Sequence, residues 1–180
     1  MKSKTAACLL LLTVSLPAMP VFIGTNTGKN TTSKGIYSAD FDPATGKLSE
    51  PKLAAEYQNP GFLAQHPSKP VIYACGQPAK PFADGTGSVG AFEVVGDHAL
   101  KFLGEASCGA KVACHLAVDA TGRTVALASY GDGKISTVRL DENGVPVNGV
   151  SLISNQGSGP NKSRQEGPHA HGVYFDKTNT

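Results

Sequence analysis

The sequence repeats one arrangement of apolar stretches and turns at a spacing of slightly more than fifty residues. When the turns are aligned, His66 matches Asp119 and Asp176, at steps of 53 and 57 residues. Each unit holds about four short stretches with the alternating pattern of β-strands. A repeat near this length, with four strands in each unit, is typical of a β-propeller. The sequence therefore predicts an all-β fold built from four-stranded blades.

The composition favours an all-β fold with many turns. Its 21 glycines and 12 prolines favour many turns, and no convincing amphipathic helix follows the first twenty residues. A β-sandwich would also contain short alternating strands, but it would not predict an internal repeat of this length. With 40% hydrophobic and 17% charged residues, the chain is expected to fold as a soluble domain.

The number of repeats is small for a propeller. The roughly 160 residues from Pro20 onward, divided by a repeat of about 53, give about three blades, whereas closed propellers use roughly four to eight. Residues 173–175 read as a strand that opens a further copy, and its turn begins at Asp176. We therefore expect the N-terminal part of an incomplete ring, whose missing blades come from a downstream segment or another chain.

The N-terminus has the pattern of a secretory signal peptide. Lys2 and Lys4 precede an apolar stretch over residues 6–16, which is too short to span a bilayer as a stable anchor. We expect residues 1–19 to be the signal peptide and residues 20–180 to be the propeller domain of an exported protein, with no membrane association after signal removal. The cleavage site stays open, and a buried first strand is the alternative.

Charge and cysteine content exclude several other functions. The net charge of +2 falls to about zero without Lys2 and Lys4, so a nucleic-acid partner is not expected. Three cysteines follow the signal peptide, and Cys108 with Cys114 is the nearest candidate pair for a disulfide. The chain has no Cys-x-x-Cys spacing, so a zinc or thioredoxin-like site has no support.

One stretch, residues 163–172, gathers more reactive side chains than any other part of the chain. It contains Arg164, Glu166, His169 and His171 within a loop that leads into the expected strand at 173–175. A carboxylate and imidazoles can move protons near neutral pH, and a guanidinium can hold an oxyanion. On a strand, the two imidazoles would share one face. We interpret these four residues as the candidate catalytic site.

Six stretches of the sequence carry a family resemblance together, namely residues 21–25, 35–37, 59–64, 115–119, 130–133 and, most specifically, 164–171. They resemble the seven-bladed lactonase propellers, the family of the bacterial 6-phosphogluconolactonases of propeller type and the fungal 3-carboxy-cis,cis-muconate lactonising enzymes. The resemblance covers the chain after the signal peptide but only about the first half of a family member. The family usually has Asn-Tyr-Gly after the second-repeat strand, whereas here Ser129 stands first.

The resemblance implies a lactonase that acts on a sugar-acid lactone without a cofactor, and it makes His115 a further catalytic candidate beside the cluster. The partner would be a small-molecule lactone or carboxylate. Glu166 or a neutral histidine would be the base, and Arg164 would hold the oxyanion or an anionic group of the substrate. Expected export argues against 6-phosphogluconolactone, an intracellular metabolite, as the substrate.

Other interpretations of the same residues stay open. A muconate-type cyclisation would use the same catalytic groups in the opposite direction. A non-catalytic propeller that binds a ligand or partner would use none of them for catalysis, and neither would a gene fragment without function. A metal held by the two imidazoles with Glu166 or His115 is a less favoured alternative. Arg164 and Glu166 could also form a simple loop ion pair. We expect His66 and His98 to be solvated, and Cys114 to face away from its neighbour His115.

Overall fold

The computed structural model describes residues 17–78, 80–176 and 178, and most of the expected signal peptide lies outside them. The described chain is all β, as the sequence predicted, with twelve strands in three four-stranded antiparallel sheets. The strands are β1 (Met19–Gly24), β2 (Gly35–Asp42), β3 (Lys47–Leu48), β4 (Lys52–Glu56), β5 (Gln58–Gln65), β6 (Val71–Gln77), β7 (Ser88–Val95), β8 (Ala99–Ser107), β9 (His115–Val118), β10 (Thr124–Ala128), β11 (Lys134–Leu140) and β12 (Pro146–Ser154).

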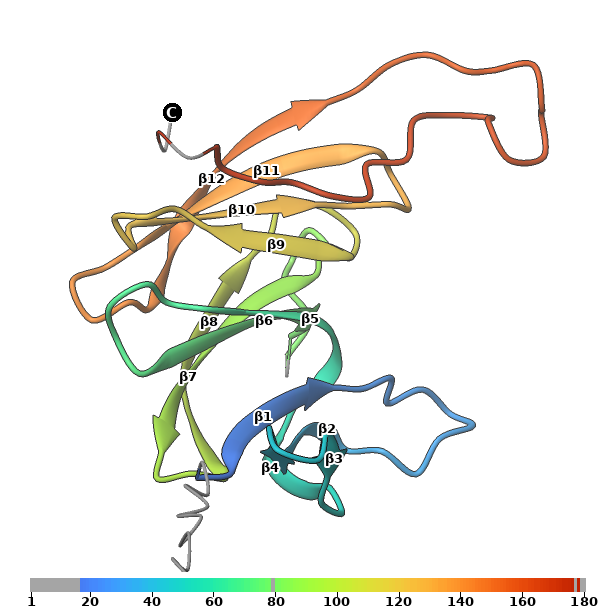
Figure 1. Ribbon diagram of the computed structural model, residues 1–180. Helices are drawn as coiled ribbons and strands as arrows, with labels where there is room; N and C mark the ends of the chain where they lie inside the picture. The colour runs from blue at the N-terminus through green and yellow to red at the C-terminus, as the bar shows by residue number, and fades with distance from the viewer. Residues whose placement is uncertain (1–16, 79, 177, 179–180) are drawn as a thin grey trace, which may run out of the picture.

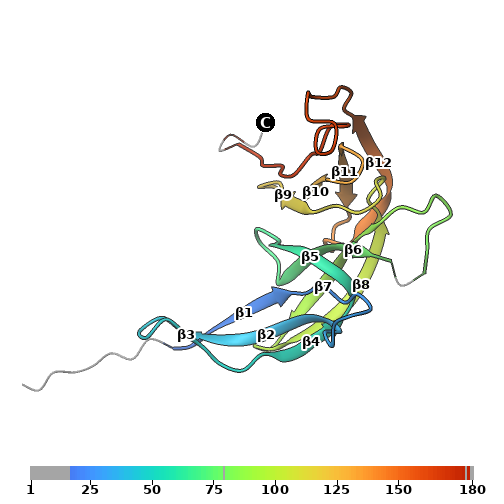
Figure 2. The ribbon, with the colours of Figure 1, turned by 90° about the vertical axis from the view of Figure 1, so that its right-hand side faces the viewer.

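The three sheets follow one another along the molecule in chain order (Figure 1). The second sheet has the order β5-β6-β7-β8, and the third has the same order, β9 to β12. Strand β5 contacts β9 and strand β8 contacts β12, so these two sheets meet along both their first and their last strands. Seen from the side, the sheets are splayed like neighbouring sectors (Figure 2). This arrangement is that of consecutive propeller blades.

The first sheet differs from the other two. Strand β1 pairs with β2 across the loop at residues 25–34, as β6 pairs with β7 and β10 with β11 across their loops. Strand β1 therefore matches the second strand of the later sheets, and no described strand takes the place of β5 or β9. The fourth strand arises because Ser49, Glu50 and Pro51 divide the outer strand into β3 and β4. Proline cannot donate a ladder hydrogen bond, which accounts for a break there.

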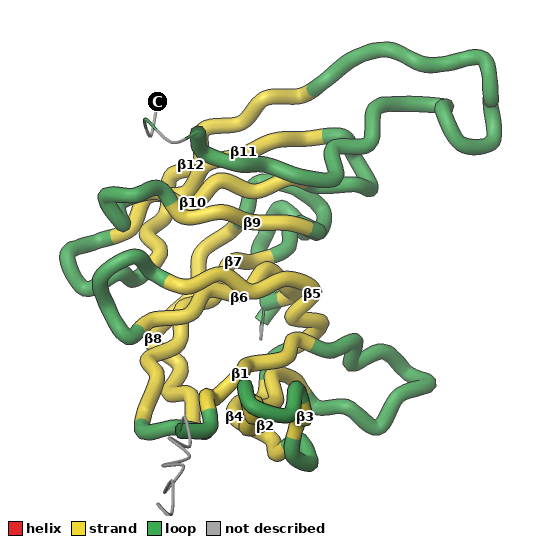
Figure 3. Tube along the Cα trace, in the orientation of Figure 1, coloured by secondary structure: helices red, strands yellow, loops and turns green. Residues whose placement is uncertain are grey.

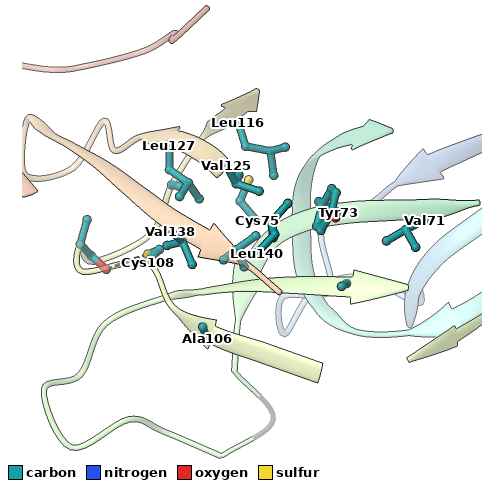
Figure 4. Close-up of a cluster of buried hydrophobic side chains, with 14 residues drawn as sticks. Val71, Tyr73, Cys75, Ala106, Cys108, Leu116, Val125, Leu127, Val138 and Leu140 are labelled. Atoms are coloured by element: carbon teal, nitrogen blue, oxygen red, sulfur yellow. Dashed lines mark hydrogen bonds between the residues drawn. The ribbon is translucent and has the colours of Figure 1, made fainter. Parts of the chain in front are cut away.

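Strand β6 is buried along almost its whole length. Its side chains alternate between the two faces of the second sheet, and both faces are covered. Val71, Tyr73 and Cys75 face the third sheet (Figure 4), whereas Ile72 and Ala74 face the first sheet. The larger cluster is completed by residues of the third sheet, namely Leu116, Val125, Leu127, Val138 and Leu140.

The aligned turns have the same hydrogen bond in each repeat. In every case the side chain of the aligned residue accepts a hydrogen bond from the backbone N–H two positions later. The pairs are His66 with Ser68 at 3.1 Å, Asp119 with Thr121 at 3.2 Å and Asp176 with Thr178 at 3.0 Å. The structure thus confirms the repeat that the sequence predicted.

The two histidines that the sequence placed in solvent are not free there. His66 is only 3% exposed, and its Nε2 lies 3.2 Å from the carbonyl oxygen of Gly122 in the third sheet. The prediction was wrong because the ring fills the space between the turns of two sheets. His98 is partly exposed, and its Nε2 lies 3.3 Å from a carboxylate oxygen of Asp40.

The candidate disulfide, which the sequence left open, is not formed, and one expected strand is absent. Cys108 and Cys114 are not bridged, since the Cys108 thiol is buried and donates to Ala110 O at 3.3 Å while Cys114 is a separate free thiol. Residues 173–175 do not form a strand. A strand requires a neighbour for its ladder, and no described strand pairs with this segment, although it runs beside the third sheet (Figure 1).

No described segment forms a helix of the length and apolar character needed to cross a bilayer. The loops gather beyond the strand ends, and the longest of them follows β12 (Figure 3).

Packing between the second and third sheets is expected to provide a large part of the stability. Replacing Leu127, which is 1% exposed, with Ala should lower the free energy of unfolding by about 2–5 kcal/mol, because it leaves a cavity in the larger core cluster. Ile153→Ala is the matched control, since Ile153 is 61% exposed and should change stability by about 0.5 kcal/mol or less. Urea unfolding would measure both values, and equal losses would contradict this account of the core.

Candidate functional site

The candidate site is built around Tyr130, in the loop at residues 129–133 between β10 and β11. Two side chains of this loop brace it. Ser129 Oγ lies 2.5 Å from Asp132 Oδ1 and 3.0 Å from the carbonyl oxygen of Val112. Asp132 Oδ2 accepts a hydrogen bond from the Lys111 backbone N–H at 3.2 Å and lies 3.3 Å from Lys134 Nζ. The loop is therefore held against the preceding segment, at residues 111–112.

Asp132 is the carboxylate that these contacts of the loop share. Burial acts to raise the pKa of its carboxyl group, but hydrogen bonds from Ser129 and the Lys111 backbone, together with Lys134, outweigh it and lower the pKa. The carboxylate thus stays ionised at neutral pH. Its stabilising contribution is present above the unfolded pKa and is lost as the pH falls through the lowered folded value.

The segment after β12 folds back over this loop. Asn155 Nδ2 donates to the carbonyl oxygen of Gly133 at 2.9 Å, which anchors the start of the segment. Further along, His169 Nδ1 lies 2.9 Å from the carbonyl oxygen of Tyr130, and the two rings stack with centroids 4.4 Å apart. The His171 ring meets the edge of Tyr130 with centroids 5.4 Å apart. Tyr130 therefore brings both imidazoles together, and both lie in the loop where the sequence placed them.

The charged residues of the stretch contact Tyr130 or its partner His169. Residues 161–165 form a tight turn in which Asn161 N donates to Gln165 Oε1 at 3.0 Å and Gln165 N donates to Asn161 O at 2.7 Å. This turn directs Arg164 Nη2 to Tyr130 Oη, at 3.1 Å. Glu166 Oε1 lies 3.3 Å from His169 Nε2. Arg164, Glu166, His169 and His171 are thus assembled around one tyrosine.

His115, the fifth candidate, lies apart from this assembly. It is 8% exposed at the start of β9, and its Nδ1 accepts a hydrogen bond from the backbone N–H of Val173 at 3.3 Å. Its ring packs between Phe62 and Tyr174, with centroids 4.2 and 4.8 Å away. Among the described residues, no hydrogen bond, ion pair or ring contact joins His115 to the other four candidates.

The contacts of His169 limit where its protons can be. A carbonyl oxygen can only accept, so the Tyr130 carbonyl fixes a proton on Nδ1 and leaves Nε2 to face Glu166. A neutral ring would then present a lone pair to the carboxyl group, and an imidazolium would donate to it. The pair is therefore suited to taking up and returning a proton.

The sequence reasoning missed the two residues that organise the site. Tyr130 and Asp132 belong to the stretch at 130–133 that was noted for its resemblance, but no pattern showed that the stretch at 163–172 would contact it. Ser129, which stands where the family usually has asparagine, lies within hydrogen-bonding distance of Asp132 and Val112. No group of three or more histidine, cysteine, aspartate and glutamate side chains suited to a metal occurs in the described ranges.

Three splayed, four-stranded antiparallel sheets, with a reactive loop that crosses strand ends, define a sector of a β-propeller. The chain belongs to the lactonase family of seven-bladed β-propellers, because the family model described as "Lactonase, 7-bladed beta-propeller" matches residues 20–180. The fold and the family that the resemblance implied are confirmed.

Individual relatives agree with this membership. The chain is 34% identical over 155 residues to the 6-phosphogluconolactonase of Bacillus subtilis (strain 168), covering 86% of the chain and 42% of that protein. A solved structure of a proposed 6-phosphogluconolactonase from Bacteroides uniformis ATCC 8492 superposes with a TM-score of 0.78 at 26% identity, covering 90% of this chain and 45% of the other.

A second solved structure, the periplasmic gluconolactonase PpgL of Pseudomonas aeruginosa, gives a TM-score of 0.77 at 20% identity and covers 90% of this chain and 45% of that one. At this identity the likeness concerns the fold. The chain thus spans less than half the length of each of these proteins.

The contact between the two loops can be tested with a pair of glycines. Gly133 has a φ of +64°, and a Cβ there would lie 2.4 Å from the carbonyl oxygen of Pro168. Gly133→Ala should therefore displace the segment that carries His169, whereas Gly131→Ala should not, because a Cβ at Gly131 has no atom within 4 Å. Histidine ring signals in NMR spectra would report the result, and identical spectra for the two variants would contradict the arrangement.

Proposed function

We propose that this chain is the sector of a lactonase that carries its proton-transfer group and acts on a sugar-acid lactone with water. The observation that supports this most directly is the linked set formed by Tyr130, His169 and Glu166, with Arg164 on the same tyrosine. It combines a proton-accepting pair with a fixed cation, which are the groups that lactone opening requires.

In the proposed reaction, a water oxygen attacks the lactone carbonyl carbon while the pair formed by Glu166 and His169 takes the water proton. Negative charge then develops on the carbonyl oxygen, where Arg164 or backbone N–H groups would hold it. The C–O bond of the ring breaks as the intermediate collapses, and the ring oxygen receives the proton as a hydroxyl. No electrons are exchanged, and the product is the open hydroxy acid.

His115 takes a positioning role in this proposal. Its Nδ1 holds Val173 N, and its ring contacts Tyr174, so it fixes the path of the segment just after His171. The site is open on one side, where Glu166 has a side chain that is 60% exposed. We propose that further blades, in the same polypeptide or in another chain, supply the remaining wall, in keeping with the greater length of the relatives.

Glu166→Gln tests this function. In the 180-residue chain, and in a chimera extended by the C-terminal part of the Bacillus subtilis relative, the parent should hydrolyse glucono-δ-lactone. The substitution should lower kcat by about 10² to 10⁴ because it removes the proton acceptor. Stability should change by about 1 kcal/mol or less, since the Glu166 side chain is largely exposed.

Lys162→Gln is the matched control for this experiment, because Lys162 is an exposed charge in the same loop whose Nζ donates a hydrogen bond to Ser158 Oγ at 3.5 Å. It should leave turnover unchanged. If neither parent protein opens a lactone, or if Glu166→Gln keeps full activity, the proposed function fails. Turnover of a muconate-type substrate instead would favour the lactonising alternative.

We also propose that the protein is exported, with residues 1–19 as its signal peptide. The basic and apolar pattern of this segment supports the proposal. Expression in a bacterial host should give a periplasmic protein whose mass lacks this segment. An intact N-terminus in the cytoplasm would contradict it.

A further inference from the structure

The hydroxyl group of Tyr130 has no role in the proposed reaction so far, although its ring is the centre of the assembly. Arg164 Nη2 lies 3.1 Å from Tyr130 Oη. A guanidinium has only N–H donors, so the phenol oxygen is the acceptor of this hydrogen bond. The chemistry of arginine therefore fixes the direction of the bond, and the phenol proton takes no part in it.

The phenol proton is available to a ligand. A tyrosine hydroxyl carries one proton, which it can donate while its oxygen accepts from another group. Within residues 17–78, 80–176 and 178, Arg164 is the one hydrogen-bond partner of the Tyr130 hydroxyl. In the free protein the proton is thus directed to water, which an oxygen atom of a substrate can replace.

Arg164 makes this hydroxyl a stronger donor. Hydrogen bonds that follow one another in a chain polarise each other, and bonds from an ionised donor are stronger than neutral ones. Because the guanidinium draws electron density from the phenol oxygen, the O–H group donates more strongly to an anion. The positive charge of Arg164 also lies next to the oxygen that would hold that anion.

The position of the hydroxyl is fixed before a substrate arrives. The Tyr130 ring stacks on His169 with centroids 4.4 Å apart and an interplanar angle of 18°, and His171 meets its edge at 5.4 Å. Ser129 and Asp132, on either side of Tyr130 in the loop, are joined to each other at 2.5 Å. A donor that needs no rearrangement is effective at stabilising negative charge as it develops.

Open space lies beside both the hydroxyl and the proton-accepting pair. A Cβ added at Gly131, the residue after Tyr130, would meet no atom within 4 Å beyond its chain neighbours, and the same is true at Gly167, the residue after Glu166. Glu166 contacts His169, the imidazole on which the Tyr130 ring stacks. The donor and the proton acceptor therefore belong to one stacked unit that small molecules can approach.

We propose that the Tyr130 hydroxyl is a catalytic hydrogen-bond donor, which binds the carbonyl oxygen of the lactone and stabilises the negative charge that develops on it. This assignment rests on the proposed function. As the water oxygen adds to the carbonyl carbon, the π electrons of the C=O bond move onto the oxygen held by Tyr130. The tyrosine keeps its proton throughout. The hydrogen bond weakens again when the ring C–O bond breaks and the carbonyl group forms anew, and Arg164 supports the charge through the phenol oxygen.

Tyr130→Phe tests the donor, because it removes the hydroxyl and keeps the ring. In the 180-residue chain and in the chimera with the Bacillus subtilis relative, kcat for glucono-δ-lactone should fall by about 10² to 10³, the scale of one lost oxyanion donor. KM should change by less than about threefold, since the bond is strongest in the transition state. Histidine ring signals in NMR spectra should match those of the parent, because the stacking on His169 is kept.

Tyr37→Phe is the matched control. Tyr37 is a half-buried tyrosine of β2 whose hydroxyl accepts a hydrogen bond from Lys34 N at 3.3 Å, and its replacement should leave kcat and KM unchanged. A double-mutant cycle with Arg164→Met gives a readout that a structural role would not move. Because Arg164 acts through the phenol, the loss caused by Tyr130→Phe should be about tenfold smaller in the Arg164→Met protein than in the parent.

Binding of the reaction product tests the donor without turnover. Sodium D-gluconate is the open hydroxy acid, and its carboxylate presents a negative oxygen to the hydroxyl. Titrated into the 180-residue chain, gluconate should shift the ring signals of Tyr130 in NMR spectra. Tyr130→Phe should weaken gluconate binding about tenfold, the scale of one lost hydrogen bond to a charged group.

The outcomes separate the two proposals. A parent protein that opens the lactone and loses this activity in Glu166→Gln, but keeps kcat within about tenfold in Tyr130→Phe, would overturn the donor and leave the lactonase. A parent protein that opens no lactone would overturn the lactonase. In that case a Tyr130-dependent affinity for gluconate would keep the anion-binding hydroxyl, and unchanged Tyr130 signals would overturn it as well.

Discussion

The packing of each sheet against its neighbours is the constraint on which the rest of the structure depends. A single four-stranded sheet of this size cannot bury its own apolar face, and here the second sheet is covered on both sides. Val71, Tyr73 and Cys75 pack toward the third sheet while Ile72 and Ala74 pack toward the first. The middle sheet therefore fixes the positions of the outer two. The packing between the sheets therefore sets where the loops at the strand ends lie relative to one another.

The candidate site depends on these relative positions of the loops. Tyr130 is presented by the loop after β10, and the segment that carries Arg164, Glu166 and His169 begins only after β12. Backbone groups make two of the joining contacts, at Gly133 O and Tyr130 O. The side chains are thereby placed by the course of the chain as much as by their own packing.

Most of the fold could be predicted from the sequence, because it depends on local patterns. Alternation marks the strands, and the turn at His66, Asp119 and Asp176 recurs with its own hydrogen bond. The burial of His66 could not be predicted, since it results from the approach of Gly122 in the next sheet. The strand expected at 173–175 was also wrong, because its sequence pattern carries no information about the presence of a pairing partner. Four site candidates meet around Tyr130, but that tyrosine became visible only when two distant loops were seen in contact.

The recurring turn shows what a repeat of this kind preserves. In the second sheet an imidazole nitrogen accepts the hydrogen bond from the N–H two residues later, and in the third sheet a carboxylate oxygen accepts it. The repeat is thus a repetition of hydrogen-bond acceptors and not of side chains. Copies of such a unit can diverge until few residues are identical while each turn still forms the same hydrogen bond. Comparison of chemical roles would then reveal internal symmetry that comparison of residue identities overlooks.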